Sequence, residues 1–209
     1  MAVGTAAICV ALSLSSHPAD IQVAHARAGD LVLHEQDSVG LCPWRNPERD
    51  RQEFFPTSTE VREETLILSR KRTEVARQLG RVSTGEENAL KVYRILRHGE
   101  VIGSVVARRV RGESGVIELL LAVGTDGNIL GARLQRMREP DDVAHSLQSG
   151  AWLGAFVGKN RASDWRLGAD IPDVPPAARV SGAAILDAAH ALLVLLTLGD
   201  SPAPSGATH

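Results

Sequence analysis

The spacing of hydrophobic and polar residues predicts a run of strands in the middle of the chain. Four segments there are continuously apolar or alternate with a period of two, as strands do. They are residues 89–96, 101–110, 116–123 and 129–137. Short turns separate them, and the Asp126-Gly127 pair before the last segment is typical of a hairpin. We therefore expect a mostly antiparallel meander.

Helical spacing precedes and follows these strands. Upstream, residues 64–69 predict a strand or turn, and residues 71–79 predict an amphipathic helix. The downstream segments are a helix from Asp141 or Asp142 to Leu147, a short helix over 152–157, and a long apolar helix ending at Leu198. The chain is thus predicted to be α+β, with a mostly antiparallel sheet, flanking helices and a long C-terminal helix.

The same pattern divides the chain into four parts. They are a signal peptide or membrane-proximal leader (1–26), a linker or extension (27–54), a folded domain (55–198) and a disordered tail (199–209). The leader assignment rests on the small apolar residues over 2–14 and on the cleavage-like Ala24-His25-Ala26, although no Lys or Arg precedes the run. We expect an exported, periplasmic protein, with a membrane-associated location as the alternative.

Composition narrows the class of function. The 209 residues carry a formal net charge of −2 and 3% aromatic residues, which argues against a nucleic-acid-binding surface. Cys9 and Cys42 form no CxxC pair and the histidines show no metal-ligand spacing, so we expect no metal site. Hydrolase and zinc-protease motifs do not occur in the sequence, so no catalytic residue is assigned.

The segment Ser181-Gly182-Ala183-Ala184 opens the last apolar run and predicts a turn at a helix start. Free backbone N–H groups and the positive end of the helix dipole form a phosphate site at such a turn. The Ser181 hydroxyl and the guanidinium of Arg179 would add contacts. The alternative interpretation is that Ser181 is a helix N-cap and that the small residues allow close packing.

Four local patterns carry a family resemblance. They are the strand–Asp-Gly–strand segment over 118–133, Arg138-Glu139-Pro140, the Trp-Leu-x-x-Phe-x-Gly-Lys pattern over 152–159, and Ser181-Gly182-Ala183. Together they resemble the FMN-binding domain family, which includes the flavin subunits of Rnf and sodium-pumping NADH:quinone reductase complexes and small exported flavoproteins. With Phe55-Pro56 the resemblance extends over residues 55–198. It implies an FMN site in which Glu139, Pro140 and Trp152 lie near the flavin ring.

Two positions depart from the attachment motif of that family, whose usual form is Ser/Thr-Gly-Ala-Thr. The last hydroxyl of the motif forms a phosphoester with FMN, whereas Ala184 has no hydroxyl. The family commonly has Asp three residues before the motif, where this chain has Ala178. The resemblance therefore implies FMN that is bound without a covalent bond, or that has been lost.

These patterns lead to a first functional hypothesis and two alternatives. The first is an electron-transfer flavoprotein, rather than a stand-alone enzyme, that works with redox partner proteins and a membrane complex. The second is a non-catalytic assembly or binding module of a membrane-associated redox complex that has lost flavin. The third is a small-ligand-binding protein that uses the same pocket.

Three groups of polar residues carry structural predictions of their own. Glu118 lies in an apolar strand, so it should pair with an Arg of a neighbouring strand. Asp187 and His190 are three residues apart and should form a local polar pair on one helix face. The arginines of the strands, Arg108 among them, are expected on a solvated face of the sheet, with attraction of a phosphate or an acidic partner as the alternative.

Overall fold

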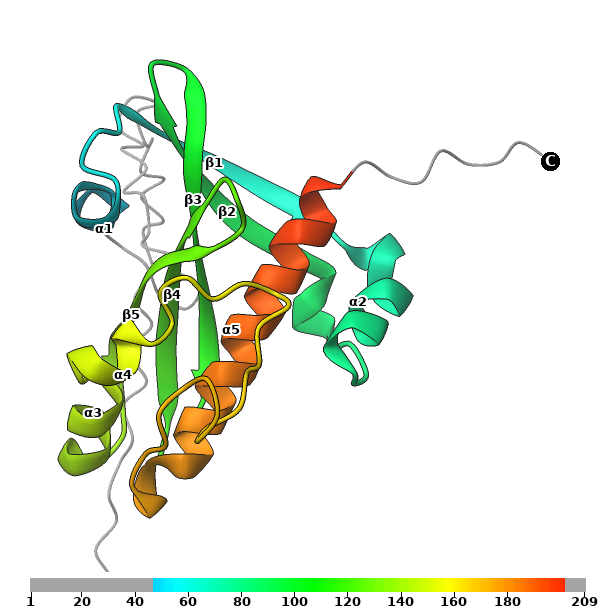
Figure 1. Ribbon diagram of the computed structural model, residues 1–209. Helices are drawn as coiled ribbons and strands as arrows, with labels where there is room; N and C mark the ends of the chain where they lie inside the picture. Colours follow the sequence, from blue (N-terminus) through cyan, green and yellow to red (C-terminus); the bar gives the residue numbers. More distant parts are fainter. Residues whose placement is uncertain (1–46, 202–209) are drawn as a thin grey trace, which may run out of the picture. The chain divides into compact units, whose positions relative to one another are not determined.

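The computed structural model describes residues 47–201. The leader predicted over residues 1–26 and most of the tail predicted over 199–209 lie outside the described residues. The described part contains one five-stranded sheet in the order β1-β2-β3-β4-β5, with every neighbouring pair antiparallel (Figure 1). The strands are β1 (Glu60–Ile67), β2 (Ala89–Arg97), β3 (Glu100–Arg111), β4 (Val116–Gly124) and β5 (Ile129–Met137). The predicted α+β class and the antiparallel meander are confirmed.

Within residues 47–201, five α-helices and three short 3₁₀ turns accompany the sheet. They are α1 (Pro47–Phe54), η1 (Ser69–Lys71), α2 (Arg72–Leu79), η2 (Gly85–Asn88), α3 (Asp141–Leu147), α4 (Gly150–Gly154), η3 (Pro176–Ala178) and α5 (Arg179–Asp200). Helices α2 and α3 lie where the periodicity predicts them. Helix α4 is shorter than the helix predicted over 152–157 and starts earlier, and α1 falls inside the stretch predicted as a linker.

Alternation along each strand sorts side chains onto two faces. In β4, Ile117, Leu119 and Leu121 join the large core that includes α5, whereas Leu120 and Ala122 join a second cluster with Phe55 on the opposite face. Successive side chains of a strand point to opposite faces. The sheet is therefore apolar on both sides at its centre, which explains why β4 reads as a continuous apolar run.

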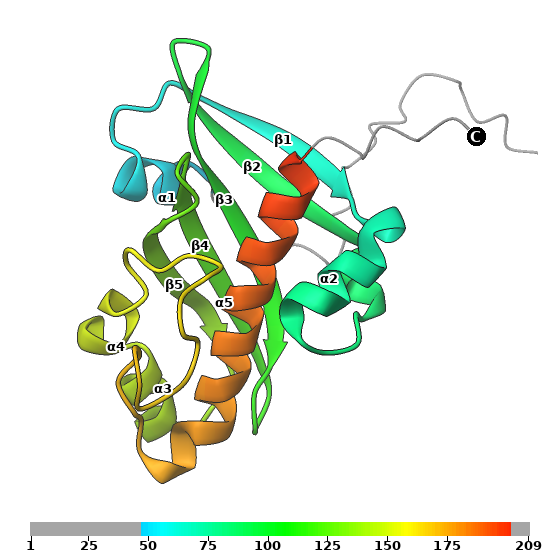
Figure 2. The same ribbon diagram turned by 45° about the vertical axis from the view of Figure 1, so that its right-hand side comes forward.

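Helix α5 crosses the face of the sheet that carries the large core, and the two views agree on this placement (Figures 1 and 2). Twelve of its 22 residues are buried. The stretch Pro176–Asp200 is long and apolar enough to cross a membrane by composition, but 67% of its most apolar window is buried inside the fold. Such burial is typical of a core helix. At the far end of α5, the Lys71 ammonium donates to the carbonyl oxygens of Leu198 (2.5 Å) and Ser201 (2.8 Å).

Candidate functional site

The Ser-Gly-Ala segment is helical from its first residue. Helix α5 begins at Arg179, so Ser181 is its third residue, and no side chain caps the helix at Ala178. In a helix the N–H groups of Gly182, Ala183 and Ala184 point back to the carbonyls four residues earlier. The expected turn with free N–H groups, and the alternative that Ser181 is the N-cap, were both wrong. Helical geometry extended two residues further upstream than the small-residue pattern suggested.

The Ser181 side chain is fully buried and joins three segments of the chain. Its hydroxyl donates to Glu139 Oε1 over 2.9 Å and accepts from the backbone N–H of Glu113 over 2.9 Å. Glu139 also accepts from the backbone N–H of Ser114, at 3.3 Å to each carboxylate oxygen. The contact needs a glycine at position 112, because a Cβ there would lie 2.0 Å from Glu139 Oε1 and 2.9 Å from Ser181 Oγ. The first turn of α5 is thereby tied to the β3–β4 hairpin.

This arrangement decides whether the start of α5 fits a phosphate. A helix N-terminus stabilises negative charge, and here the Glu139 carboxylate already lies against the first turn. A second anion at the same place would meet like charge at close range. The first turn of α5 therefore does not fit the phosphate of FMN.

The remaining residues expected at the cofactor lie in three different surroundings. Arg179 is exposed and forms an ion pair with Asp173. Pro140 precedes the first residue of α3 and is exposed. Trp152 is 3% exposed, and its indole N–H donates to the Pro172 carbonyl over 3.2 Å. The structure brings Glu139 and Ser181 together but encloses Trp152 in the core.

The outward flank of α5 beyond Ser181 borders a pocket of about 760 Å³. Asp187 lines this pocket, and Ala184 lies one turn before it, about 60° around the helix axis and about 4.5 Å along it. Ala184 is half-buried and Ala183 is exposed. The other lining residues are Arg81, Val82, Thr84, Gly85, Glu86 and Arg108. The position that carries the attachment hydroxyl in the resembled family therefore lies one turn from the pocket and does not line it.

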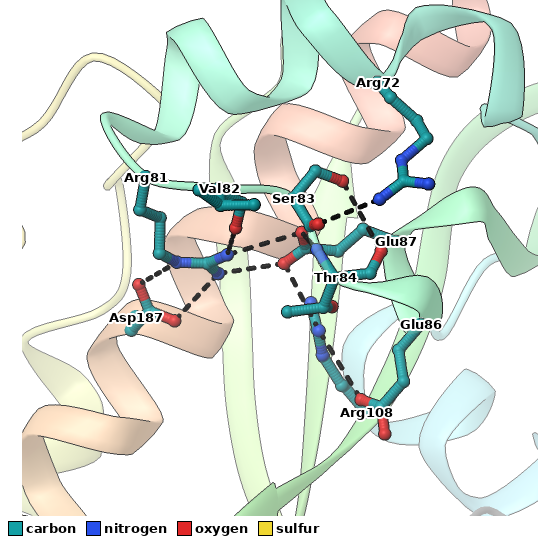
Figure 3. A network of polar contacts seen from close by, with 9 residues as sticks. All are labelled: Arg72, Arg81, Val82, Ser83, Thr84, Glu86, Glu87, Arg108 and Asp187. Atoms are coloured by element: carbon teal, nitrogen blue, oxygen red, sulfur yellow. Dashed lines mark hydrogen bonds and ion pairs between the residues drawn. The ribbon is translucent and has the colours of Figure 1, made fainter.

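Arg81 lines this pocket and binds Asp187 of α5. Its guanidinium donates to both oxygens of Asp187, at 3.1 and 2.9 Å, and to both oxygens of Glu87, at 3.3 and 2.9 Å (Figure 3). Those hydrogen bonds raise the pKa of Arg81 above its usual value. Burial acts to raise the pKa of the fully buried Glu87 carboxyl, but the bonds from Arg81 and from the backbone N–H of Thr84 outweigh it and lower the pKa. Both groups are therefore ionised near neutral pH.

Arg108 is less completely paired than Arg81. Its Nη2 lies 3.4 Å from Glu87 Oε1 and 3.6 Å from Glu86 Oε2, both long for a charge-assisted bond (Figure 3). Its Nη1 is buried and, within residues 47–201, is the one buried side-chain nitrogen without a hydrogen-bond partner. The pocket carries the carboxylates of Glu86 and Asp187, with Glu87 behind them, against the two guanidiniums of Arg81 and Arg108. Its charges therefore do not favour an added anion.

We predicted from the sequence that Arg108 lies on a solvated face of the sheet, and this prediction was wrong. The side chain is 16% exposed and lies on the α5 face of the sheet. The signal that could have found it is strand alternation, since Val106 and Val110 share its face and both belong to the core.

A second cleft of about 660 Å³ lies between the β4–β5 turn and the C-terminal end of α5. Its most enclosed charged side chain, Arg94, binds Glu64 and Asp200 and also donates to the Ser104 hydroxyl. This cleft therefore presents a fully paired cation, unlike the pocket beside Arg108.

Two structural predictions have different outcomes. Glu118 lies 3.7 Å from both Arg109 and Arg136 of the neighbouring strands, so its expected pairing is confirmed. The expected Asp187–His190 pair was wrong, because Asp187 binds Arg81 instead. The His190 ring stacks on Trp165, with centroids 6.1 Å apart, and its Nε2 lies 3.1 Å from the Arg161 carbonyl oxygen. Burial lowers the pKa of His190 below its usual value.

The fold and the site define a class: an α+β domain whose long C-terminal helix carries a Ser-Gly-Ala segment in its first turns. Comparison with known proteins gives two relatives. The chain is 32% identical over 81 residues to the subunit designated G of the ion-translocating oxidoreductase complex of Cereibacter sphaeroides, and 31% identical to the same protein of a second strain. Each match covers 38% of this chain and 37% of the relative's own length. No protein-family profile matches the chain.

Proposed function

We propose that this protein is an exported electron-transfer subunit that binds FMN without a covalent bond and works in a membrane-associated redox complex. Two observations support the proposal. The chain is similar over 81 residues to a subunit of an ion-translocating oxidoreductase complex, and Ala184, on the flank of α5, occupies the position of the attachment hydroxyl of the resembled family. The second observation carries the non-covalent part.

The side chains at the start of α5 would have separate roles in such a site. Ala184 leaves no atom to esterify, so a phosphate on this flank has to be held by charge and hydrogen bonds. Ser181 and Glu139 fix the first turn of α5 against the β3–β4 hairpin, which sets the position of the flank. The flavin itself supplies one- and two-electron transfer when bound, and the protein supplies orientation and electrostatics.

A second candidate function is a non-catalytic assembly module of the same kind of complex. The closed first turn of α5 and the enclosed Trp152 favour it, because both remove places where the resembled family would contact a cofactor. The two candidates differ in whether the purified chain binds flavin at all.

The test is to make the chain in cells that also make a flavin transferase and to record the flavin absorbance before and after acid precipitation. Yellow colour that passes to the supernatant is expected, since acid unfolds the protein and releases a non-covalent ligand. Colour that stays in the pellet would contradict the account of Ala184. A colourless protein that gains no absorbance when FMN is added would favour the assembly module.

A further inference from the structure

We propose that the face of the sheet opposite α5 binds the anionic surface of a phospholipid bilayer. The side chains that carry the proposal, here called the arginine face, are Arg109 and Arg111 of β3 together with Arg136 and Arg138 at and just beyond the end of β5. All four are exposed. The inference goes beyond the proposed function, and it does not depend on whether the chain binds flavin.

A buried carboxylate fixes the position of two of these guanidiniums. Glu118 alternates along β4 with Leu120 and Ala122, which belong to the apolar cluster on the side of the sheet away from α5. Its carboxylate oxygens lie 3.7 Å from the Nε atoms of Arg109 and Arg136, one on each neighbouring strand. The two guanidiniums therefore lie on either side of Glu118, on the face away from α5.

The other two guanidiniums extend the same end of the sheet. Arg111 is opposite Val116 in the register of β3 and β4, and the backbone N–H of Arg138 donates to the Val116 carbonyl over 3.3 Å. Val116 precedes Glu118 by two residues in β4, so the two share a face. Because adjacent strands lie about 4.8 Å apart, the positive charge extends about 10 Å from β3 to β5. Such a distribution fits a charged surface better than one small anion.

This end of the sheet has an excess of positive charge. Glu118 is 3% exposed, and Glu113 at the tip of the β3–β4 hairpin is an exposed second carboxylate. Asp141 and Asp142 belong to α3, whose Val143 packs in the core on the α5 side of the sheet. Four guanidiniums against the first two carboxylates leave a net charge of +2, which attracts an anionic lipid surface.

Two exposed apolar side chains lie on the same face. Val116 is 44% exposed beside Arg111, and Ile67 at the end of β1 is 67% exposed. Ile67 points away from α5 because Leu66, the residue before it, is buried in the core on the α5 side. Basic side chains beside exposed apolar ones suit the headgroup region of a bilayer, where the charges meet phosphates and the apolar groups meet the acyl chains. The combination favours a lipid surface over an acidic protein segment.

The chain also enters the domain on this side. Helix α1 is the first described element, and Phe54 at its end belongs with Phe55 to the apolar cluster away from α5. Phe54 packs directly on β5, since a Cβ on Gly131 would lie 2.2 Å from its ring. The 46 residues before Pro47, which include the leader predicted over 1–26, thus join the domain on the side of the arginine face. A membrane-proximal leader would bring this face toward the bilayer.

The test measures how the full chain sediments with two kinds of vesicle, one of phosphatidylcholine and one of equal parts of phosphatidylcholine and phosphatidylglycerol. The chain should bind the anionic vesicles more tightly, and the difference should shrink as salt is added, because salt screens exposed charges. The double substitution Arg111→Gln and Arg138→Gln should weaken binding to anionic vesicles about tenfold to thirtyfold. The matched control, Arg97→Gln with Arg166→Gln, removes the same charge from exposed positions outside the arginine face and should change the affinity less than about twofold.

The outcomes decide between the lipid surface and its alternatives. Equal binding of the wild-type chain to the two vesicles, or equal losses in the two double variants, would overturn the proposal. Ile67→Ser should also weaken binding to the anionic vesicles. An unchanged affinity of Ile67→Ser, with retention of the wild-type chain on immobilised polyglutamate, would assign the face to an acidic protein segment and overturn the lipid assignment.

Folding and flavin binding are controlled separately. Circular dichroism reports whether each variant is folded, and if the Arg111/Arg138 variant is not, the two single substitutions replace it and each should weaken binding about fivefold. No loss in either folded single variant would overturn the proposal. A titration with FMN distinguishes this failure from that of the proposed function, because vesicle binding can be lost while flavin binding remains, and the reverse.

Discussion

The hydroxyl of Ser181 donates a hydrogen bond to Glu139 Oε1 over 2.9 Å, and this joins two residues 42 positions apart in the sequence. The bond lies at the start of the long core helix, where an anion is electrostatically favoured. A carboxylate of the protein itself takes that place. The helix start is therefore a structural junction between α5 and the β3–β4 hairpin.

We expect Ser181→Ala to lower the free energy of unfolding by about 1–3 kcal/mol, because the change leaves the Glu139 carboxylate and the Glu113 N–H without their buried partner. Urea denaturation followed by circular dichroism measures it. The matched control is Ser146→Ala, whose exposed hydroxyl bonds the Asp142 carbonyl of its own helix and should change stability by less than about 0.5 kcal/mol. Equal effects of the two substitutions would mean that the junction adds nothing.

The lowered pKa of Glu87 predicts that the folded protein loses stability in acid. Its pKa in the folded protein lies below the usual value, so its contribution is fully present above about pH 4.3 and is lost as the pH falls through the folded pKa. Glu87→Gln should lower stability at pH 7 by about 1–3 kcal/mol and flatten the fall of the melting temperature below about pH 4. The exposed neighbour gives the control, since Glu86→Gln should keep the wild-type acid profile. An unaltered profile in Glu87→Gln would refute the assignment.

A hydroxyl introduced at position 184 should allow covalent attachment of flavin. Ala184→Thr places an acceptor hydroxyl on the half-buried flank of α5, so in cells with a flavin transferase this variant is expected to carry flavin that survives acid precipitation. Ala183→Thr adds the same hydroxyl one residue earlier, at an exposed position, and should stay unlabelled. Fluorescence of the protein band in a denaturing gel reports the result. Labelling of both variants, or of neither, would contradict the geometry proposed for this flank.

The sequence predicted the sheet well because alternation and the Asp126-Gly127 turn are local signals. It misplaced the start of α5, since residues 179 and 180 have no helix-capping pattern and their helical geometry is set by packing of η3 and of Ala178 in the core. The Arg81–Glu87–Asp187 network joins residues up to 106 positions apart, and no local pattern carries such a contact. Arg108 was within reach of sequence reasoning through its register with Val106 and Val110, but its unpaired Nη1 depends on where Glu86 and Glu87 lie.

Mass spectrometry of the purified chain with FMN tests the central claim most directly. Under native conditions the chain should carry the mass of one FMN, and under denaturing conditions the same sample should have the mass of the unmodified chain. FMN retained under denaturing conditions would contradict the non-covalent account. A native spectrum with no FMN adduct, at concentrations where a known FMN protein is saturated, would contradict the claim that this chain binds flavin.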